Sequence, residues 1–347
     1  MASSRSVSPD LKRVDKLLRK GGLTPRRKRT QSGWSGNSRQ SERKEILPQA
    51  ARRVVKSRVE IVRAPGWDAW PWLVHGFSTR TGGVTTAYRP GQRAGELNLG
   101  FTQTDTRENV AENRRRFLEA LGAPKMQLVT LKQIHSSVVK RAGADDADRD
   151  APCQGDGLMT NEPGVLLAIQ TADCIPVLVA DVKRRAVAAF HAGWRGTLQR
   201  IVENGVGRMR SEFHSRPEDL IAAIGPGIAA CCYAVGEEVR SEFASQFAYA
   251  PELFTEVSDS DGVRDKYPLL FLTARAPGHS NLGPQLHLDL MEANRRQLLD
   301  AGLRAESIAT IGDCTRCQNN RYFSYRAEQG FTGRLLSVVG MRATSRR

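Results

Sequence analysis

The sequence lacks the features that would place it in a membrane or in a dinucleotide-binding fold. No apolar run reaches the roughly 20 residues of a membrane-spanning helix. The N-terminus has no hydrophobic segment of the secretory type. No Gly-x-Gly-x-x-Gly pattern opens a helix after the first expected strand. We therefore expect a cytoplasmic protein without membrane contact.

Cysteine and histidine are scarce, with six of each in 347 residues. A chain of this length can bury its own core, so we expect reduced thiols and not a disulfide framework. Cys314 and Cys317 form the one Cys-x-x-Cys pair, whereas a zinc ribbon needs two such pairs. We therefore expect this pair to pack or to line a pocket, and we expect Cys231 and Cys232 to pack around the preceding glycine turn.

Charge is unevenly distributed along the chain. The net charge is +15, but residues 1–58 alone hold 17 Lys/Arg and 4 Asp/Glu. This basic segment is rich in Ser, Gly and Arg and has too few apolar residues to offset the entropy of ordering. We expect residues 1–58 to be a disordered tail, in which Leu11–Lys20 alone has the pattern of a basic amphipathic helix. A contact with a nucleic acid or an anionic surface would have to come from this tail, but we favour a solvated extension without a specific partner.

From residue 59 onward the hydrophobic pattern predicts one domain of mixed strands and helices, with no internal repeat. Strands are expected at Leu73–Ser78, Gln127–Val139 (broken), Val165–Ala180 (two pieces around Thr171–Cys174), Arg185–Phe190, Leu220–Gly225, Ser307–Ile311 and Leu335–Val339. Helices are expected at Asp105–Leu121, Thr197–Phe213 and Asp289–Ala301, with Asp105 and Asp289 as N-caps. Few repeated strand–helix–strand units are present, which favours an α+β fold with mixed sheets.

Three side chains at strand breaks are candidate metal ligands. His135 follows a Val/Leu segment, Cys174 lies in the turn after an apolar strand, and His191 ends the next strand. Two imidazoles and one thiolate suit zinc or copper and leave one position open. Their separations of 39 and 17 residues match no local metal motif, so spacing alone leaves a structural role equally plausible.

Two glycine-containing turns are candidate anion sites. Gly193 and Gly196 precede the helix expected near Thr197, whose free N–H groups would point back at the turn. Arg80 lies beside Gly82 and Gly83, where a guanidinium and flexible backbone together suit a phosphate or carboxylate. A plain surface charge is an equally good interpretation of Arg80.

Several of these segments together resemble the YfiH family, also called the laccase-domain or multicopper polyphenol oxidase family. The matching motifs, in order, are Val74-His-Gly-Phe-Ser-Thr-Arg-Thr-Gly-Gly83, Leu97-Asn-Leu-Gly100, Gln133-Ile-His135, Asp156-Gly157, Thr171-Ala-Asp-Cys174, His191-Ala-Gly-Trp-Arg-Gly196, Ile224-Gly-Pro-Gly227, Cys232-Tyr233, Ala293-Asn-Arg-Arg296, Asp313-Cys-Thr315 and Phe323-Ser-Tyr-Arg326. The resemblance covers residues 59–342 and leaves the tail outside.

The resemblance implies a single catalytic domain with α/β/β/α layers. It also implies a site of two histidines and one cysteine, which falls on His135, Cys174 and His191 by motif and would hold zinc, with copper as the alternative. Among the matched motifs, the expected substrate and phosphate contacts are Arg80, Asp173, Arg195 and Arg326.

The activities attributed to the family are not uniform. They are phosphorolysis of adenosine, inosine and methylthioadenosine to the free base and ribose 1-phosphate, deamination of adenosine, copper-dependent phenol oxidation and peptidoglycan editing. Six histidines are too few for a cluster of several copper centres. We therefore expect a metal-dependent purine nucleoside phosphorylase with adenosine deaminase as a second activity, and phenol oxidation or peptidoglycan editing as the alternatives. Cys174 is either a metal ligand or a nucleophile with His135 as its base.

Overall fold

A computed structural model describes residues 58–89, 91, 94–147, 152–257 and 285–343. All of them belong to one unit, Arg53–Arg347. The expected basic tail lies outside the described residues apart from Arg58.

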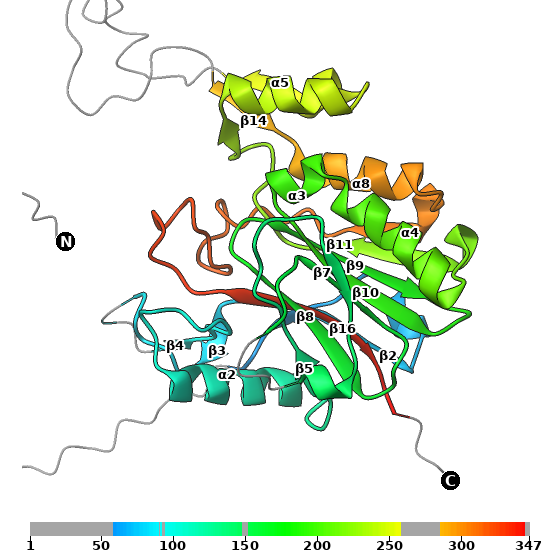
Figure 1. Ribbon diagram of the computed structural model, residues 1–347. Coiled ribbons are helices and arrows are strands. Elements are labelled where there is room, and N and C mark those ends of the chain that lie inside the picture. Colours follow the sequence, from blue (N-terminus) through cyan, green and yellow to red (C-terminus); the bar gives the residue numbers. More distant parts are fainter. Residues whose placement is uncertain (1–57, 90, 92–93, 148–151, 258–284, 344–347) are drawn as a thin grey trace, which may run out of the picture. The chain divides into compact units, whose positions relative to one another are not determined.

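Two sheets dominate the described part of the chain (Figure 1). The first sheet has the order β1-β2-β16-β8-β5 and the second β15-β11-β9-β10-β7-β6. The strands of the first are β1 (Ile61–Val62), β2 (Leu73–Ser78), β16 (Leu335–Met341), β8 (Val165–Thr171) and β5 (Gln127–Val129). Those of the second are β15 (Ile308–Thr310), β11 (Leu220–Ile224), β9 (Ile175–Asp181), β10 (Ala186–Ala192), β7 (Gly157–Thr160) and β6 (Val139–Arg141).

Both sheets are mixed. Parallel pairing occurs between β5 and β8 in the first sheet, and between β11 and β15 and between β6 and β7 in the second. The other strand pairs in these two sheets are antiparallel. The prediction of an α+β fold with mixed sheets is confirmed.

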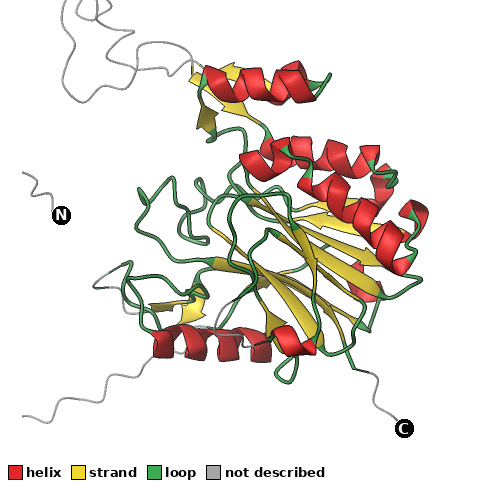
Figure 2. Ribbon diagram, in the orientation of Figure 1, coloured by secondary structure: helices red, strands yellow, loops and turns green. Residues whose placement is uncertain are grey.

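The two sheets pack face to face, and helices cover their outer faces. Leu167 and Val339 of the first sheet share a buried cluster with Leu178 and Val187 of the second. Phe117 of helix α2 (Arg107–Ala120) packs on the outer face of the first sheet. Helices α4 (Ile201–Phe213) and α8 (Leu290–Asp300) pack on the outer face of the second (Figure 2). These layers form the expected α/β/β/α arrangement.

Smaller elements complete the described fold. Helix α3 (Trp194–Leu198) precedes α4, and helix α5 is Glu237–Gln246. Strands β12 (Ala234–Val235), β14 (Gln285–Leu288) and β13 (Phe254–Val257) form a three-stranded sheet, and β3 (Thr81–Gly83) pairs with β4 (Gly95–Glu96). Short 3-10 turns lie at Trp67–Ala69, Ala144–Asp146, Pro217–Asp219, Ala250–Leu253 and Ala305–Ser307. No described helix is long and apolar enough to cross a membrane.

Predictions based on apolar runs and on helix caps placed several elements correctly. Strand β2 has the predicted bounds, and the run 165–180 divides into β8 and β9 at the expected turn. Helix α8 begins after Asp289, whose carboxylate accepts a hydrogen bond from the Glu292 N–H at 2.9 Å. Such a side chain satisfies one of the free N–H groups in the first turn.

Three local predictions were wrong. Thr106, not Asp105, caps α2, because its hydroxyl accepts from the Asn109 N–H at 3.2 Å. The helix expected from 197 to 213 is two helices, α3 and α4, separated by Arg200 in the left-handed region (φ 59°). The broken strand 127–139 becomes β5 and β6, which belong to different sheets.

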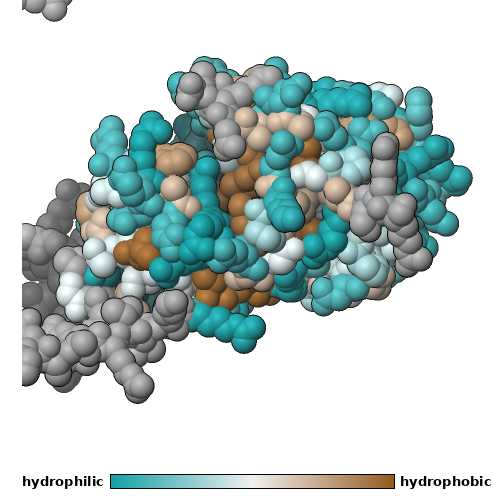
Figure 3. All heavy atoms as spheres, turned by 90° about the horizontal axis from the view of Figure 1, so that it is seen from below, coloured by the Kyte–Doolittle hydropathy of each residue, from teal (hydrophilic) through white to brown (hydrophobic). Residues whose placement is uncertain are grey.

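The surface seen from below the view of Figure 1 carries hydrophilic residues over most of its area, with apolar residues gathered in its middle (Figure 3).

Candidate metal and substrate site

His135, Cys174 and His191 lie together. Their ligand atoms are all within 4.8 Å of one another, and the two imidazole rings meet edge to face with centroids 4.9 Å apart. His135 comes from the segment between β5 and β6, Cys174 from the turn between β8 and β9, and His191 from β10. The fold therefore assembles three candidate ligands that are far apart in sequence.

Two segments that pass from one sheet to the other bring the first two ligands to the site. The chain passes from the first to the second sheet between β5 and β6, and again between β8 and β9. Both crossings contain a non-glycine residue with positive φ, His135 at 60° and Asp173 at 96°. Such conformations are costly for these residues and persist where the surrounding contacts hold them.

Asp156 holds the His135 segment and His191 in place. Its fully buried carboxylate accepts hydrogen bonds from the N–H groups of His135 (3.0 Å) and Ser136 (2.6 Å). The Ser136 hydroxyl donates to the same carboxylate at 2.7 Å. Oδ1 lies 2.8 Å from Nδ1 of His191, which leaves Nε2 of that ring free to act as a ligand.

The surroundings of Cys174 and His191 favour the charged form of each side chain. Burial alone would raise the pKa of Cys174, but the neighbouring His191 and His135 lower that pKa from 9.0 to about 6. Burial alone would lower the pKa of His191, but the Cys174 thiolate and Asp156 raise it from 6.5 to about 9. For Asp156, hydrogen bonds from His191 and Ser136 outweigh burial and lower its pKa to about 2. Cys174 is therefore a thiolate near neutral pH.

The residues present fit a metal ion. One thiolate and two imidazoles are the donors that zinc and copper prefer, and Asp156 supplies the carboxylate partner that a ligating histidine usually has. Gly193 leaves room beside them, since a Cβ there would lie 3.0 Å from Sγ of Cys174 and 3.2 Å from Cδ2 of His135. The trio is therefore a candidate metal site with donors suited to zinc or copper.

A pocket of about 560 Å³ opens over the trio, within the usual size range of small-ligand sites. Its walls combine aromatic, amide and cationic groups. It is lined by Leu131, Gln133, His135, Gln170, Thr171, Ala172, Asp173, Cys174, His191, Ile228, Tyr233, Tyr325, Arg326 and Arg334. The buried Thr171 hydroxyl has no hydrogen-bond partner among the described residues, so it is free to bind a polar group of a ligand.

Arg80 lies outside this pocket. Its guanidinium is 2% exposed, pairs with Glu96 at 2.5 Å and Glu328 at 2.9 Å, and lies 4.5 Å from the centre of the Phe323 ring. It also donates to the carbonyl of Asn319 at 2.5 Å. A side chain that binds phosphate has to reach the pocket with its hydrogen-bond donors. These contacts hold the Arg80 guanidinium away from the pocket, so the prediction of Arg80 as a phosphate contact is not supported.

Two of the other three predicted contacts line the pocket. Asp173 and Arg326 line it, and Asp173 accepts from Thr315 Oγ1 at 2.6 Å, Ser324 Oγ at 2.7 Å and the Arg326 N–H at 2.6 Å. Asp173 thereby joins the Cys174 turn to the C-terminal loop. Arg195 is exposed, stacks on Trp194 and is not among the residues lining the pocket.

Sequence reasoning missed several residues of the site. The sequence indicated Asp156 only as part of a matched motif and gave it no role. Its position between Gly155 and Gly157, after a polar stretch, is typical of a turn. Tyr233 and Tyr325 were recognised only as members of matched motifs and were given no role, and Arg334 lies in none of those motifs. Tyr233 follows β11, whereas Tyr325 and Arg334 lie between β15 and β16, so only the fold brings them together.

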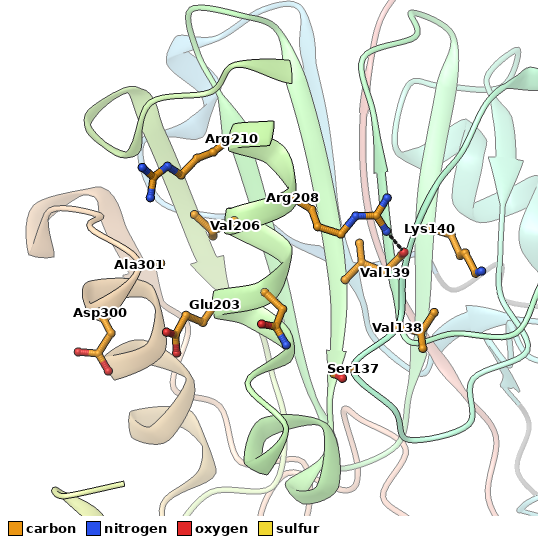
Figure 4. A pocket seen from close by; sticks show the side chains of 12 residues that line it. Ser137, Val138, Val139, Lys140, Glu203, Val206, Arg208, Arg210, Asp300 and Ala301 are labelled. Carbon is orange, nitrogen blue, oxygen red and sulfur yellow. Dashed lines mark hydrogen bonds between the residues drawn. The ribbon is translucent and has the colours of Figure 1, made fainter. Parts of the chain in front are cut away.

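A second hollow of about 720 Å³ lies against α4 (Figure 4). Glu203 and Arg210 of α4 line it, together with Lys140 of β6 and Asp300 of α8; Arg208 donates to the Val139 carbonyl. None of its lining residues is a histidine or a cysteine. Its chemistry is that of a solvated surface of mixed charge.

Residues 74–342 match the family described as multi-copper polyphenol oxidoreductase laccase. The chain belongs to this family. A purine nucleoside phosphorylase of Deinococcus radiodurans is 37% identical over 282 residues, which are 81% of this chain and 92% of the relative. The purine nucleoside phosphorylase YlmD of Geobacillus stearothermophilus is 34% identical over 288 residues, 79% of this chain and 96% of the relative.

Solved structures of the family have the same fold. The crystal structure of the protein YfiH of Bacillus licheniformis matches 84% of this chain and 98% of its own, with a TM-score of 0.68 and 26% sequence identity. The resemblance to the YfiH family and the predicted fold class are thus confirmed. The names of the relatives support an enzyme of the purine nucleoside phosphorylase type.

Replacing Asp156 with asparagine is expected to lower metal affinity by about 10- to 100-fold, the usual cost of losing the partner of a ligating histidine. His191 would lose its anionic partner, so the imidazolium would be less favoured and the pKa of Cys174 would rise. Zinc competition titration measures the affinity. Alkylation of Cys174 in metal-free protein measures the pKa, with the parent rate rising through about pH 6 and the variant rate rising at higher pH.

Asp300→Asn, outside this pocket, serves as the control. Unchanged zinc affinity and an unchanged alkylation profile in Asp156→Asn would show that the carboxylate does not orient His191.

Proposed function

We propose that this chain cleaves the glycosidic bond of a purine nucleoside with inorganic phosphate, giving the free base and ribose 1-phosphate. The observation that carries the proposal is a pocket in which the His135/Cys174/His191 trio lies with two tyrosines and two arginines. The names of the relatives point to the same reaction.

Tyrosines provide the surface for the base. Tyr325 is 55% exposed and Tyr233 lines the same pocket, so an aromatic ligand can stack on either ring. Stacking of a base on an aromatic side chain contributes about 1–3 kcal/mol. Burial raises the pKa of Tyr233, so its hydroxyl stays protonated and can donate a hydrogen bond. The hydroxyl of Thr171 offers a second polar contact.

Two arginines provide the positive charge that phosphate needs. Arg326 and Arg334 both line the pocket, from the C-terminal segment that precedes β16. A guanidinium holds a phosphate through paired, charge-assisted hydrogen bonds. We place the phosphate there, so that one of its oxygens attacks C1′ of the ribose. The bond from C1′ to N9 then breaks, and the purine leaves with the electron pair and takes up a proton.

The trio and its partners would contribute charge and orientation. Zinc held by His135, Cys174 and His191 would act as a Lewis acid toward an oxygen of the substrate, and copper fits the same donors. Asp156 fixes the ring of His191 through Nδ1. Asp173 uses its carboxylate to hold Thr315, Ser324 and the backbone of Arg326, so we assign it a positioning role.

Product analysis tests the proposal. Protein of known metal content is incubated with adenosine, inosine or methylthioadenosine, with and without phosphate. The products are identified by mass spectrometry. Free base and ribose 1-phosphate that form only with phosphate support phosphorolysis. Inosine formed from adenosine without phosphate would add a deaminase activity.

The absence of purine products from metal-loaded protein would contradict the proposal. A rate of phenol oxidation that scales with copper content would favour the oxidase instead.

A further inference from the structure

Four cysteines form a second cluster of candidate ligands. Their Sγ atoms all lie within 4.8 Å of one another, with Cys232 and Cys317 3.3 Å apart and Cys231 and Cys317 3.6 Å apart. Cys231 and Cys232 follow the turn after β11, and Cys314 and Cys317 follow β15. The adjacent pair thus completes a set that the one Cys-x-x-Cys motif could not form alone.

We propose that these four thiolates bind a structural zinc ion. In a tetrahedral site with zinc–sulfur bonds of about 2.3 Å, the sulfurs lie roughly 3.8 Å apart. The two Sγ–Sγ distances are close to this value and far above the roughly 2.05 Å of a disulfide bond. All four cysteines are free thiols.

The cluster has the character of a closed, structural site. Four protein donors fill the coordination of zinc, whereas the His135/Cys174/His191 trio leaves one position open. Cys232 and Cys314 are buried and Cys231 and Cys317 exposed, so an ion can enter from solvent and become enclosed.

Nearby groups offset the negative charge of the thiolates. The Ala229 N–H donates to Sγ of Cys314 at 3.5 Å. The Arg316 guanidinium lies beside the pair 231–232 and donates to the Cys232 carbonyl at 3.5 Å. Hydrogen bonds to the ligating groups are typical of metal sites.

A zinc ion here would join two loops that form one wall of the substrate pocket. Gly227 forms a bridge with Cys314, and the Thr315 N–H donates to the Gly227 carbonyl at 2.9 Å. Thr315 in turn holds Asp173, the residue before Cys174. Tyr233 directly follows the pair 231–232. The site would therefore brace the pocket without touching the reacting atoms, and it does not depend on the proposed reaction.

Zinc content and X-ray absorption test this site. We expect Cys174→Ser protein to retain an ion with four sulfur neighbours at about 2.3 Å, because only the trio is disrupted. Cys317→Ser should lose that ion and keep any ion with mixed nitrogen and sulfur neighbours. Cys153→Ser, an exposed cysteine outside both groups, should match the parent protein.

Two results would overturn the proposal. One is Cys174→Ser protein that holds no zinc after loading with the ion, or whose zinc lacks an all-sulfur environment. The other is a pair of cluster thiols that alkylate only after reduction, which would indicate a disulfide. If Cys317→Ser does not fold, the absorption spectrum of Cys174→Ser decides the question alone.

Discussion

Alanine at position 174 is expected to lower phosphorolysis by roughly 10²- to 10⁴-fold, the range for losing a positioned catalytic group. The change removes the only sulfur donor of the trio, whose thiolate also helps to raise the pKa of His191. Since Cys174 lies in the turn between β8 and β9 and not within a strand, the fold should persist. Steady-state kinetics measures the loss of activity, zinc analysis measures the loss of metal, and thermal unfolding checks that the fold persists.

Further variants separate a ligand from a nucleophile. Aspartate or histidine at 174 can bind a metal but lacks the sulfur nucleophile. If either variant binds more zinc and is more active than Cys174→Ala, Cys174 is a metal ligand. If either variant binds more zinc but stays inactive, Cys174 is a nucleophile. Cys153→Ser is the matched control. Activity of Cys174→Ala within about tenfold of the parent, a difference of about 1.4 kcal/mol in the barrier, would exclude Cys174 from the reaction.

Methionine in place of Arg80 is expected to destabilise the protein by about 3–5 kcal/mol, because it leaves Glu96 buried without its main partner. Burial already raises the pKa of Glu96, and Arg80 opposes that rise. Without Arg80, folded Glu96 would hold its proton more tightly than the unfolded chain does. The loss of stability should therefore be larger at neutral than at acidic pH, where the carboxyl is protonated in both states.

Urea unfolding at the two pH values measures this effect. The control is Arg115→Met, which removes the same kind of side chain from the exposed ion pairs with Glu112 and Glu119 and should change stability little. Equal stability of Arg80→Met and the parent at neutral pH would show that the buried pair contributes nothing. A selective rise in KM for phosphate with unchanged stability would instead return Arg80 to a role in binding.

Strands that are buried on both faces were the most predictable part of the fold. Strands β8, β9 and β10 read as near-continuous apolar runs because one face packs on the other sheet and the second on helices or neighbouring residues. Asp289 marked the start of α8 because an N-cap depends on local backbone chemistry.

Features that depend on distant contacts were not predictable. The helical spacing of apolar residues continues without interruption past Arg200, so the sequence predicts one helix. In the structure the Arg200 guanidinium donates to the Gln246 carbonyl and stacks on Phe247. These contacts hold Arg200 in the conformation that separates α3 from α4. The separate sheets of β5 and β6 likewise follow from pairing with strands that come later in the chain.

The candidate site was foreseen in part. Strand ends indicated His135, Cys174 and His191, and the structure brings these three together. Arg80 looked equally suitable from its glycine-rich surroundings, but its partner Glu328 is 248 residues away. The four-cysteine cluster was missed for the same reason, since its two halves are more than 80 residues apart.

The two crossings between the sheets give the trio a further property. Each crossing anchors one end in each layer, so the spacing of His135 and Cys174 follows the spacing of the layers. A partly unfolded state that kept both sheets but loosened the apolar contacts between them would separate the donors while every strand stayed intact. The affinity of the trio for a metal ion would then depend on the packing between the two sheets and not on whether the strands are formed. Substitutions between the sheets, such as at Leu167 or Leu178, would thereby change the affinity of the trio for a metal ion without contacting it.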